Sequence, residues 1–364
     1  MIVIGADTHK QSHTCGAVIA GTGQLAGELT APARKAGFAE LLDWGRRLDP
    51  ERIWAIEDCR HVSGSLERFL VASGERVVRV PPKLMGQSRR GERAAGKSDP
   101  IDALAVARAA VREGPETLPA AHLDEAALDL KLLLDHREDL VKARSEDQCR
   151  LRWHLHDLWP ELELPAGCLD RIVWLDRVAR KLARAEQGAR VRICRELVRA
   201  IRERTRRAAE LEREIAASVR AQAPQLLAFP GCGALTAAKL LAETAGVARF
   251  ASDAKLARLA GVAPIPASSG KRNRHRLDRG GNRQLNCAVH RIAVTQSRIH
   301  QPAREFLARK RAEGKSTREA LRCLKRHLIR RIWLLLNESE VDLSMSNPVN
   351  PQRGSLAPQF AAVA

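Results

Sequence analysis

The order of apolar runs in the first 80 residues constrains the fold of this chain more than any other feature. Short β-prone runs and amphipathic stretches alternate there, which predicts the order βββαβαβ. We expect a further helix after Pro100, which completes an α/β domain over residues 1–112. The expected strands are 2–7, 14–21, 24–31, 52–58 and 76–80, and the expected helices are 35–48 and 63–74.

The charge of the chain points to a polyanionic partner. The sequence holds 62 Lys and Arg against 43 Asp and Glu, a formal net charge of +19, which favours nucleic acid over a small acidic substrate. It has no tyrosine, so a tyrosine nucleophile is excluded. Aromatic side chains are few, with six Phe and six Trp, and little base stacking is therefore expected. We expect contacts of Lys and Arg with phosphates to dominate binding.

The cysteines and the apolar segments indicate a cytoplasmic protein. Eight cysteines are scattered without a C-x-x-C pair or a Cys/His cluster, which is typical of reduced thiols and not of a zinc site. The N-terminus lacks the pattern of a signal peptide, and no apolar run reaches the length of a membrane span, so no membrane partner is expected.

A helical region of different composition follows, over residues 113–222. Leu, Ala, Arg and Glu recur there with helical period, which predicts two long helices at 124–158 and 189–221. This pattern suits an antiparallel hairpin or coiled coil, and either a solvated spacer or a dimerisation arm would explain it.

The rest of the chain predicts an all-α domain over residues 223–340 and a disordered tail over 341–364. The sequence Pro-Gly-Cys-Gly at 230–233 lies between two short apolar helix patterns. This is typical of a helix-hairpin-helix, in which Gly231 and Gly233 would let backbone N–H groups approach a DNA phosphate. A plain turn between two helices is the alternative.

Four acidic residues stand where the predicted elements begin or end. Asp7 and Glu57 lie at strand ends, and Asp99 and Asp102 lie at the start of the helix after Pro100. Each has a simpler explanation alone: turn former, strand-end charge, or a capping box with Asp99 as the N-cap. Together, in a basic chain, they favour a site for one or two Mg²⁺ ions acting on a phosphodiester. The neighbouring Asp58 leaves open which acid of that pair faces the metal.

A second group of candidates lies at residues 261–286. Ser268 and Ser269 precede a glycine and a basic run, and a serine hydroxyl among cations can attack phosphorus. A flexible Ser-Gly turn with a phosphate-binding loop is the alternative. With the two hairpin glycines, the candidate nucleic-acid-binding residues are Gly231, Gly233, Lys271, Arg272, Arg274, Arg276, Arg279 and Asn282.

These motifs, in this order, resemble those of the IS one-ten family of insertion-sequence transposases, relatives of the pilin-gene invertases. The resemblance rests on the four acids with "DPIDA", the long helical insert, "PGCG", "PASSG" and "GGNRQL", and extends to about residue 337. The acids Asp7, Glu57, Asp99 and Asp102 match the Asp-Glu-Asp-Asp pattern of the RuvC-like branch of the RNase H fold. The family pattern has Lys and Arg where this chain has Arg279 and Asn286.

The resemblance implies a metal-dependent DNA recombinase of a bacterial insertion sequence, acting at the nucleoid. Its acids and a serine would form one composite site, and the serine would become covalently joined to cut DNA; we prefer Ser269 to Ser268 because it directly precedes glycine. A noncoding bridge RNA would pair with donor and target DNA, and two DNA partners imply a dimer or tetramer. Two alternatives remain: a RuvC-like structure-specific nuclease without a serine nucleophile, and a non-enzymatic DNA-binding protein.

Overall fold

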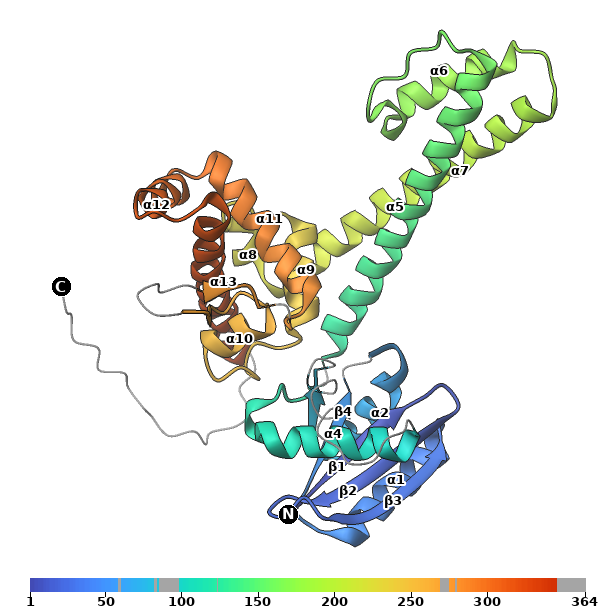
Figure 1. The fold of residues 1–364 in the computed structure, drawn as a ribbon. Helices are drawn as coiled ribbons and strands as arrows, with labels where there is room; N and C mark the ends of the chain where they lie inside the picture. Colours follow the sequence, from blue (N-terminus) through green and yellow to red (C-terminus); the bar gives the residue numbers. More distant parts are fainter. Residues whose placement is uncertain are drawn as a thin grey trace.

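The computed structural model shows three parts: an α/β domain, a long helical arm, and a group of C-terminal helices (Figure 1). The structure describes residues 1–57, 60–81, 84, 98–122, 124–268, 275–278 and 280–345. Within these ranges the side chains are described as well, except at 60–63 and 339–345.

A five-stranded mixed sheet forms the centre of the α/β domain. Its order is β3-β2-β1-β4-β5; β1 is antiparallel to β2 and parallel to β4, and β4 is parallel to β5. The domain thus has a mixed sheet with the predicted element order βββαβαβ, and a largely helical region follows it. The strands are β1 (Ile2–Thr8), β2 (Ser12–Ile19), β3 (Leu25–Pro32), β4 (Arg52–Glu57) and β5 (Val77–Val80).

Helices cover both faces of this sheet. Alternate residues of the strands point to opposite faces, so the side chain of Ile4 packs with α1 (Lys35–Leu48) and α2 (Arg60–Ala72), whereas that of Val3 packs with α4 (Asp99–Glu113). The helix α1 has the predicted bounds, and α2 begins three residues before the predicted one. A 3₁₀ turn at Pro115–Thr117 follows α4.

The arm consists of two antiparallel helices, α5 (Glu125–Leu158) and α7 (Ala189–Gln222), close to the predicted bounds. Apolar side chains join them at both ends, for example Leu134 with the core around Ile215, and Leu155 with the core around Val198. Ion pairs join them in between. At the far end of the arm, the 3₁₀ turn Cys168–Asp170 and the helix α6 (Ile172–Ala183) fold back on the pair (Figure 1). A coiled coil and a dimerisation role stay predictions.

The C-terminal helices share a core with the near ends of α5 and α7, in which Leu240, Ile292 and Ile329 are fully buried. The last helix reaches Met345, past the residue 340 at which we expected the domain to end, and the predicted tail beyond it lies outside the described residues. The elements are α8 (Pro224–Ala228), α9 (Ala234–Thr244), α10 (Asp253–Leu259), β6 (Ile265–Pro266), β7 (His275–Arg276), α11 (Arg283–Ile299), α12 (Gln301–Ala312) and α13 (Thr317–Met345).

In the described residues, no helix has both the length and the apolar character needed to cross a bilayer. The cysteines that the structure describes are free thiols.

Candidate active site

The end of the central strand pair places two of the predicted acids side by side. Ala6 of β1 is paired with Ile56 of β4 in parallel register, so Asp7 and Glu57 occupy the next position in each strand. By strand alternation both lie on the face of the sheet that α4 covers. Asp7 is 8% exposed and Glu57 is half-buried.

Two glycines let α4 pack directly against the sheet on this face. A Cβ at Gly5 would lie 2.2 Å from the carbonyl oxygen of Ala103, and one at Gly16 would lie 3.3 Å from the backbone nitrogen of Leu104. Larger side chains at these two positions would hold the helix away from the sheet. Gly5 and Gly16 therefore set the depth at which α4 lies beside Asp7.

The first turn of α4 brings the other two acids to Asp7. The Asp102 N–H donates to the carbonyl oxygen of Ser98 at 3.0 Å, so the helix starts at Asp99 and the N-cap is Ser98. Our assignment of Asp99 as the N-cap is therefore wrong by one residue. The carboxylate of Asp99 does not cap the helix and extends toward β1, while Asp102 is buried, with 6% exposed.

A histidine that the sequence did not single out lies between two of these carboxylates. His9 Nε2 is 3.1 Å from Asp7 Oδ2 and 3.4 Å from Asp99 Oδ1. The signal available in the sequence was its position two residues after Asp7, which puts both side chains on the same side of an extended segment. Burial raises the pKa of Asp7; the nearby His9 lowers it, Asp102 and Asp99 raise it further, and the net shift is upward.

The donor atoms at this point suit a divalent cation. Among the described residues, ligand atoms of Asp7, His9 and Asp99 all lie within 4.8 Å of one another. Carboxylate oxygens with one imidazole nitrogen bind several divalent metals, and the cation would offset both the burial and the repulsion from Asp102 and Asp99 that raise the pKa of Asp7. Asp102 and Glu57 lie beside this group rather than in it. The site thus fits a divalent metal; its identity as Mg²⁺ stays a prediction.

The serine segment is described only in part. Ser268 is exposed and follows β6, and Arg276 is exposed in β7. The union of a serine with the acids in one site therefore stays a prediction. The candidates that lie outside the described residues are Ser269, Lys271, Arg272, Arg274 and Arg279.

The "GGN" sequence shapes the start of α11. Asn282 is its N-cap, accepting hydrogen bonds from the N–H groups of Gln284 and Leu285. A Cβ at Gly281 would lie 2.2 Å from the backbone nitrogen of Gly261, so only glycine permits this approach. The predicted contact of Asn282 with nucleic acid stays a prediction, beside this structural role.

A partly buried polar network ties Asn282 to the arm. Its side-chain amide donates to Glu243 Oε2 at 2.5 Å, and Lys131 of α5 lies 3.1 Å from Glu243 Oε1. Lys239, also buried, pairs with Glu138 and donates to Gln284 Oε1 at 2.8 Å. These charges are paired between α5 and α9, and the amide groups of Asn282 and Gln284 join them to the start of α11, so the network fixes where the arm joins the C-terminal helices.

At position 286 the family pattern has Arg, and here Asn286 accepts a hydrogen bond from a lysine of another helix. The amide of Asn286 donates to the carbonyl oxygens of Ala260 and Gly261, and its oxygen accepts from Lys325 Nζ at 2.8 Å. Burial lowers the pKa of Lys325. A positive charge from α13 thus lies beside the residue at which the sequence lacks one.

The "PGCG" turn has the helix boundaries that the sequence predicts. The helix α8 ends before Phe229, and Gly233 is the N-cap of α9 with no capping side chain. Gly231 has φ 79°, and a Cβ there would lie 3.2 Å from the Ile292 carbonyl oxygen, whereas a Cβ at Gly233 would meet nothing within 4 Å. Gly231 therefore serves packing against α11, and the open side of the turn is at Gly233. Binding of DNA by this turn stays a prediction.

Two family models match this chain. Residues 4–160 match a model of the DEDD domain of IS110-type proteins, described as "Transposase". Residues 223–308 match the "Transposase IS116/IS110/IS902 family".

Relatives are similar over most of the chain. A 44.8 kDa protein of insertion element IS116 from Streptomyces clavuligerus is 28% identical and a 42 kDa protein of IS900 from Mycobacterium paratuberculosis is 26% identical; each comparison covers 93% of this chain and 96% of the relative. A 43.6 kDa protein of IS110 from Streptomyces coelicolor is 28% identical over 66% of this chain and 71% of its own. Among solved structures, Thermus thermophilus RuvC in complex with a Holliday junction substrate is 16% identical over 31% of this chain and 96% of its own, with a TM-score of 0.25.

Proposed function

Because this chain belongs to the IS110/IS116 family of transposases, we propose that it cuts and rejoins the DNA strands of an insertion sequence at the acidic site of β1 and α4. The observation that carries this proposal is the meeting of Asp7 and Asp99 at His9, with Asp102 buried alongside. The charges of Asp99 and Asp102 act on Asp7, and a bound cation would offset their repulsion.

We propose that Asp7, Asp99 and His9 hold Mg²⁺, with Asp102 and Glu57 completing the site. The metal would supply charge stabilisation to the attacking and leaving oxygens of the phosphodiester. Asp99 and His9 are the exposed members of the group, so they face the side from which DNA would arrive. Asp7 and Asp102 are buried, so their task is to fix the position of the metal and to keep the site anionic.

The nucleophile in this proposal is the hydroxyl of Ser269, or of Ser268. Its oxygen forms a bond to phosphorus while one backbone P–O bond of the DNA breaks, and the proton of the serine passes to the departing oxygen through solvent. The basic residues around the serine, Arg276 among the described ones, would stabilise the charge that develops on the phosphoryl oxygens.

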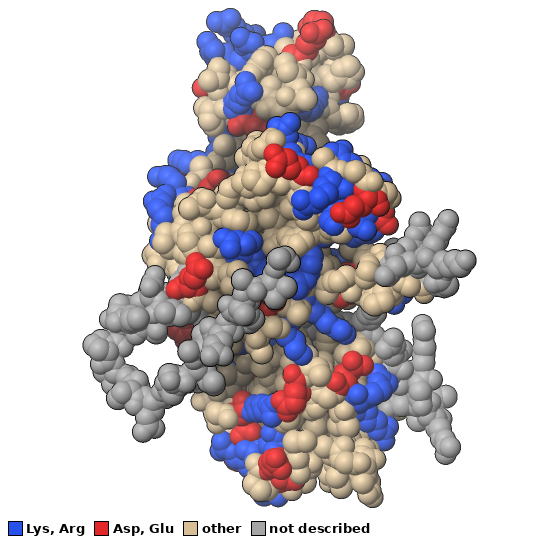
Figure 2. Space-filling view, turned by 90° about the vertical axis from the view of Figure 1, so that its left-hand side faces the viewer, with Lys and Arg blue, Asp and Glu red and all other residues tan. Residues whose placement is uncertain are grey.

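Donor DNA, target DNA and a noncoding bridge RNA are the proposed partners, bound by a dimer or tetramer. Figure 2 shows Lys and Arg side chains on the arm, on the C-terminal helices and on the α/β domain, with smaller groups of acids between them. This distribution supports phosphate contacts along much of the molecule rather than at one small site. Two DNA partners require two active sites, which supports the oligomer.

The test is a search for a covalent protein–DNA adduct. The protein is incubated with end-labelled element DNA, bridge RNA and Mg²⁺, denatured, and resolved by gel electrophoresis. We expect an adduct with the wild type and with whichever of Ser268→Ala and Ser269→Ala leaves the nucleophile intact. Strand exchange unaffected by both substitutions would contradict the serine role. Cleavage without any adduct would point instead to a nuclease that uses water.

A further inference from the structure

A row of arginines follows one face of α7 near the far end of the arm. Their spacing of three, four, three and four residues keeps them on one side of the helix. At a rise of 1.5 Å per residue the row extends for roughly 21 Å. Its members are Arg192, Arg195, Arg199, Arg202 and Arg206.

The first four of these arginines line a groove between α6 and the start of α7, which we call the arm groove. Its volume is about 630 Å³, and none of its lining residues is acidic. The other lining residues are Ala179, Gln187, Gly188, Ala189 and Val198.

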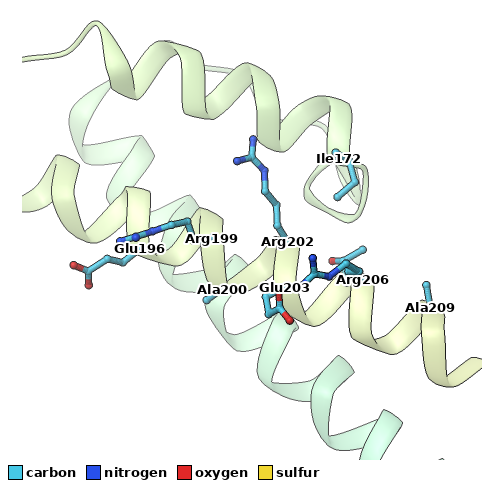
Figure 3. Close-up of a pocket in the computed structure, with 9 residues that line it drawn as sticks. Ile172, Glu196, Arg199, Ala200, Arg202, Glu203, Arg206 and Ala209 are labelled. Atoms are coloured by element: carbon cyan, nitrogen blue, oxygen red, sulfur yellow. Dashed lines mark hydrogen bonds and ion pairs between the residues drawn. The ribbon is translucent and has the colours of Figure 1, made fainter.

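A second hollow of about 960 Å³ continues the row along α7. Figure 3 shows it, with Arg199 and Arg202 shared by both and Arg202 pointing from α7 toward α6. Glu196 and Glu203 line this hollow too, and Glu203 pairs with Arg206, so of the two hollows only the arm groove has a lining without acidic residues.

The charges of the arm groove are largely uncompensated. Among the described residues, Arg192 and Arg199 have no ion-pair partner, and Arg195 donates only to the neutral Gln187 Oε1, at 2.8 Å. Arg202 pairs with Asp176, but its Nε is buried and has no hydrogen-bond partner in the described structure. Three guanidinium groups thus converge on one groove without an acid to neutralise them, an arrangement that favours an anionic ligand.

The start of α7 adds to the same potential. This helix has 34 residues, its N-cap is Gly188, no side chain caps it, and no acid lies in its first turn. Free N–H groups and the positive end of the helix dipole therefore open into the groove beside Arg192. Arginine side chains and backbone N–H groups together are the donors that bind phosphate oxygens.

We propose that the arm groove and the arginine row bind the phosphodiester backbone of a nucleic acid, at a site separate from the acids that cut DNA. A single small anion would occupy two or three guanidinium groups, whereas a row of about 21 Å matches several successive phosphates of one strand. The groove lies at the end of the arm, away from the α/β domain (Figure 1). The arm thereby holds nucleic acid at a distance from the acids of β1 and α4.

The test compares two full-length variants that lose the same charge. One carries Arg192→Gln, Arg195→Gln and Arg199→Gln. The control carries Arg207→Gln, Arg213→Gln and Arg220→Gln, on α7 but outside both hollows. Binding of a labelled DNA duplex and of a labelled RNA hairpin is measured by fluorescence anisotropy at several salt concentrations.

We expect the groove variant to lose affinity for at least one probe by about 10- to 100-fold, with the salt slope reduced by about 2 to 3, and the control to change by less than about threefold. The probe that loses more affinity identifies the nucleic acid as DNA or RNA. Equal losses in both variants, or unchanged binding of both probes by the groove variant, would overturn the proposal.

Two further measurements keep the result interpretable. Single variants Arg192→Gln and Arg199→Gln remove side chains without a described partner, so they should fold and each weaken binding by about 3- to 10-fold. Asp102→Asn should leave arm binding intact, so a failure of the cleavage proposal and a failure of the arm proposal give different results.

Discussion

Gly5 of β1 and Ala103 of α4 lie so close that a Cβ at Gly5 would be 2.2 Å from the Ala103 carbonyl oxygen. This contact sets the distance between the sheet and the helix that carries Asp99 and Asp102. The geometry of the acidic site therefore depends on a residue that has no side chain.

We predict that Gly5→Ala damages both the fold and the site. The added methyl group must push α4 outward, which we expect to lower the free energy of unfolding by about 1–3 kcal/mol and to reduce metal-dependent cleavage. Gly21→Ala is the matched control, because a Cβ there meets nothing within 4 Å. Chemical denaturation and a cleavage assay check both effects; equal behaviour of the two variants would contradict them.

His9→Ala should weaken metal binding at the acidic site. Its imidazole bridges Asp7 and Asp99, with Nε2 at 3.1 and 3.4 Å from their carboxylates. We expect the Mg²⁺ concentration for half-maximal cleavage to rise about 10-fold or more. The exposed His156 of α5 provides the control substitution His156→Ala. An unchanged Mg²⁺ requirement in the His9 variant would remove the histidine from the site.

Glu75 should make the α/β domain sensitive to acid. Burial by itself would raise the pKa of Glu75, but hydrogen bonds from Arg52 and Trp54 and the nearby charges lower it below its usual range. A lowered folded-state pKa contributes stability above the unfolded-state pKa, about 4.3, and that stability is lost as the pH falls through the lower folded-state value.

Glu75→Gln should therefore lower the free energy of unfolding by about 1–3 kcal/mol at pH 7, and the gap to wild type should narrow below about pH 4. Urea denaturation of both proteins across this pH range is the measurement. A gap that stays constant as the pH falls would show that the charge of Glu75 is not what stabilises the domain.

We predict that Asp147 stabilises the middle of the arm through its ion pairs. It is 5% exposed on α5 and pairs with Arg204 of α7 and with Arg150. Asp147→Ala removes a buried carboxylate and leaves the half-buried guanidinium of Arg204 without its partner, so we expect a loss of about 1–3 kcal/mol. Asp157→Ala removes an exposed pair with Arg190 and should cost less than about 1 kcal/mol. Thermal unfolding of both variants tests the difference.

The sequence predicted those features that depend on local pattern. Hydrophobic periodicity located the five strands, the helix at 35–48 and the two long helices of the arm, because each buries one face or both over many residues. The turn at "PGCG" was also predictable, since glycine and proline mark it directly. The N-cap of α4 was misplaced by one residue because Ser98 and Asp99 are both favourable caps.

Features that depend on tertiary contact were not predictable from one sequence. The close approach of Gly5 to α4 joins segments almost 100 residues apart, and the network of Glu243 joins three helices. The role of His9 required knowing that Asp99 returns to the end of β1. The spacing of the arginines of α7 can be read from the sequence, but only the packing of α6 against α7 shows that they line a groove.

Metal-dependent cleavage by Asp102→Asn tests the central claim most directly. Asn is close in size to Asp, so the buried position should stay filled, with DNA affinity near that of the wild type and stability within about 1 kcal/mol. Glu113→Gln, at the other end of α4, is the control and should cleave like the wild type. We predict that Asp102→Asn shows no cleavage at any Mg²⁺ concentration; cleavage at the wild-type rate would contradict a catalytic site at β1 and α4.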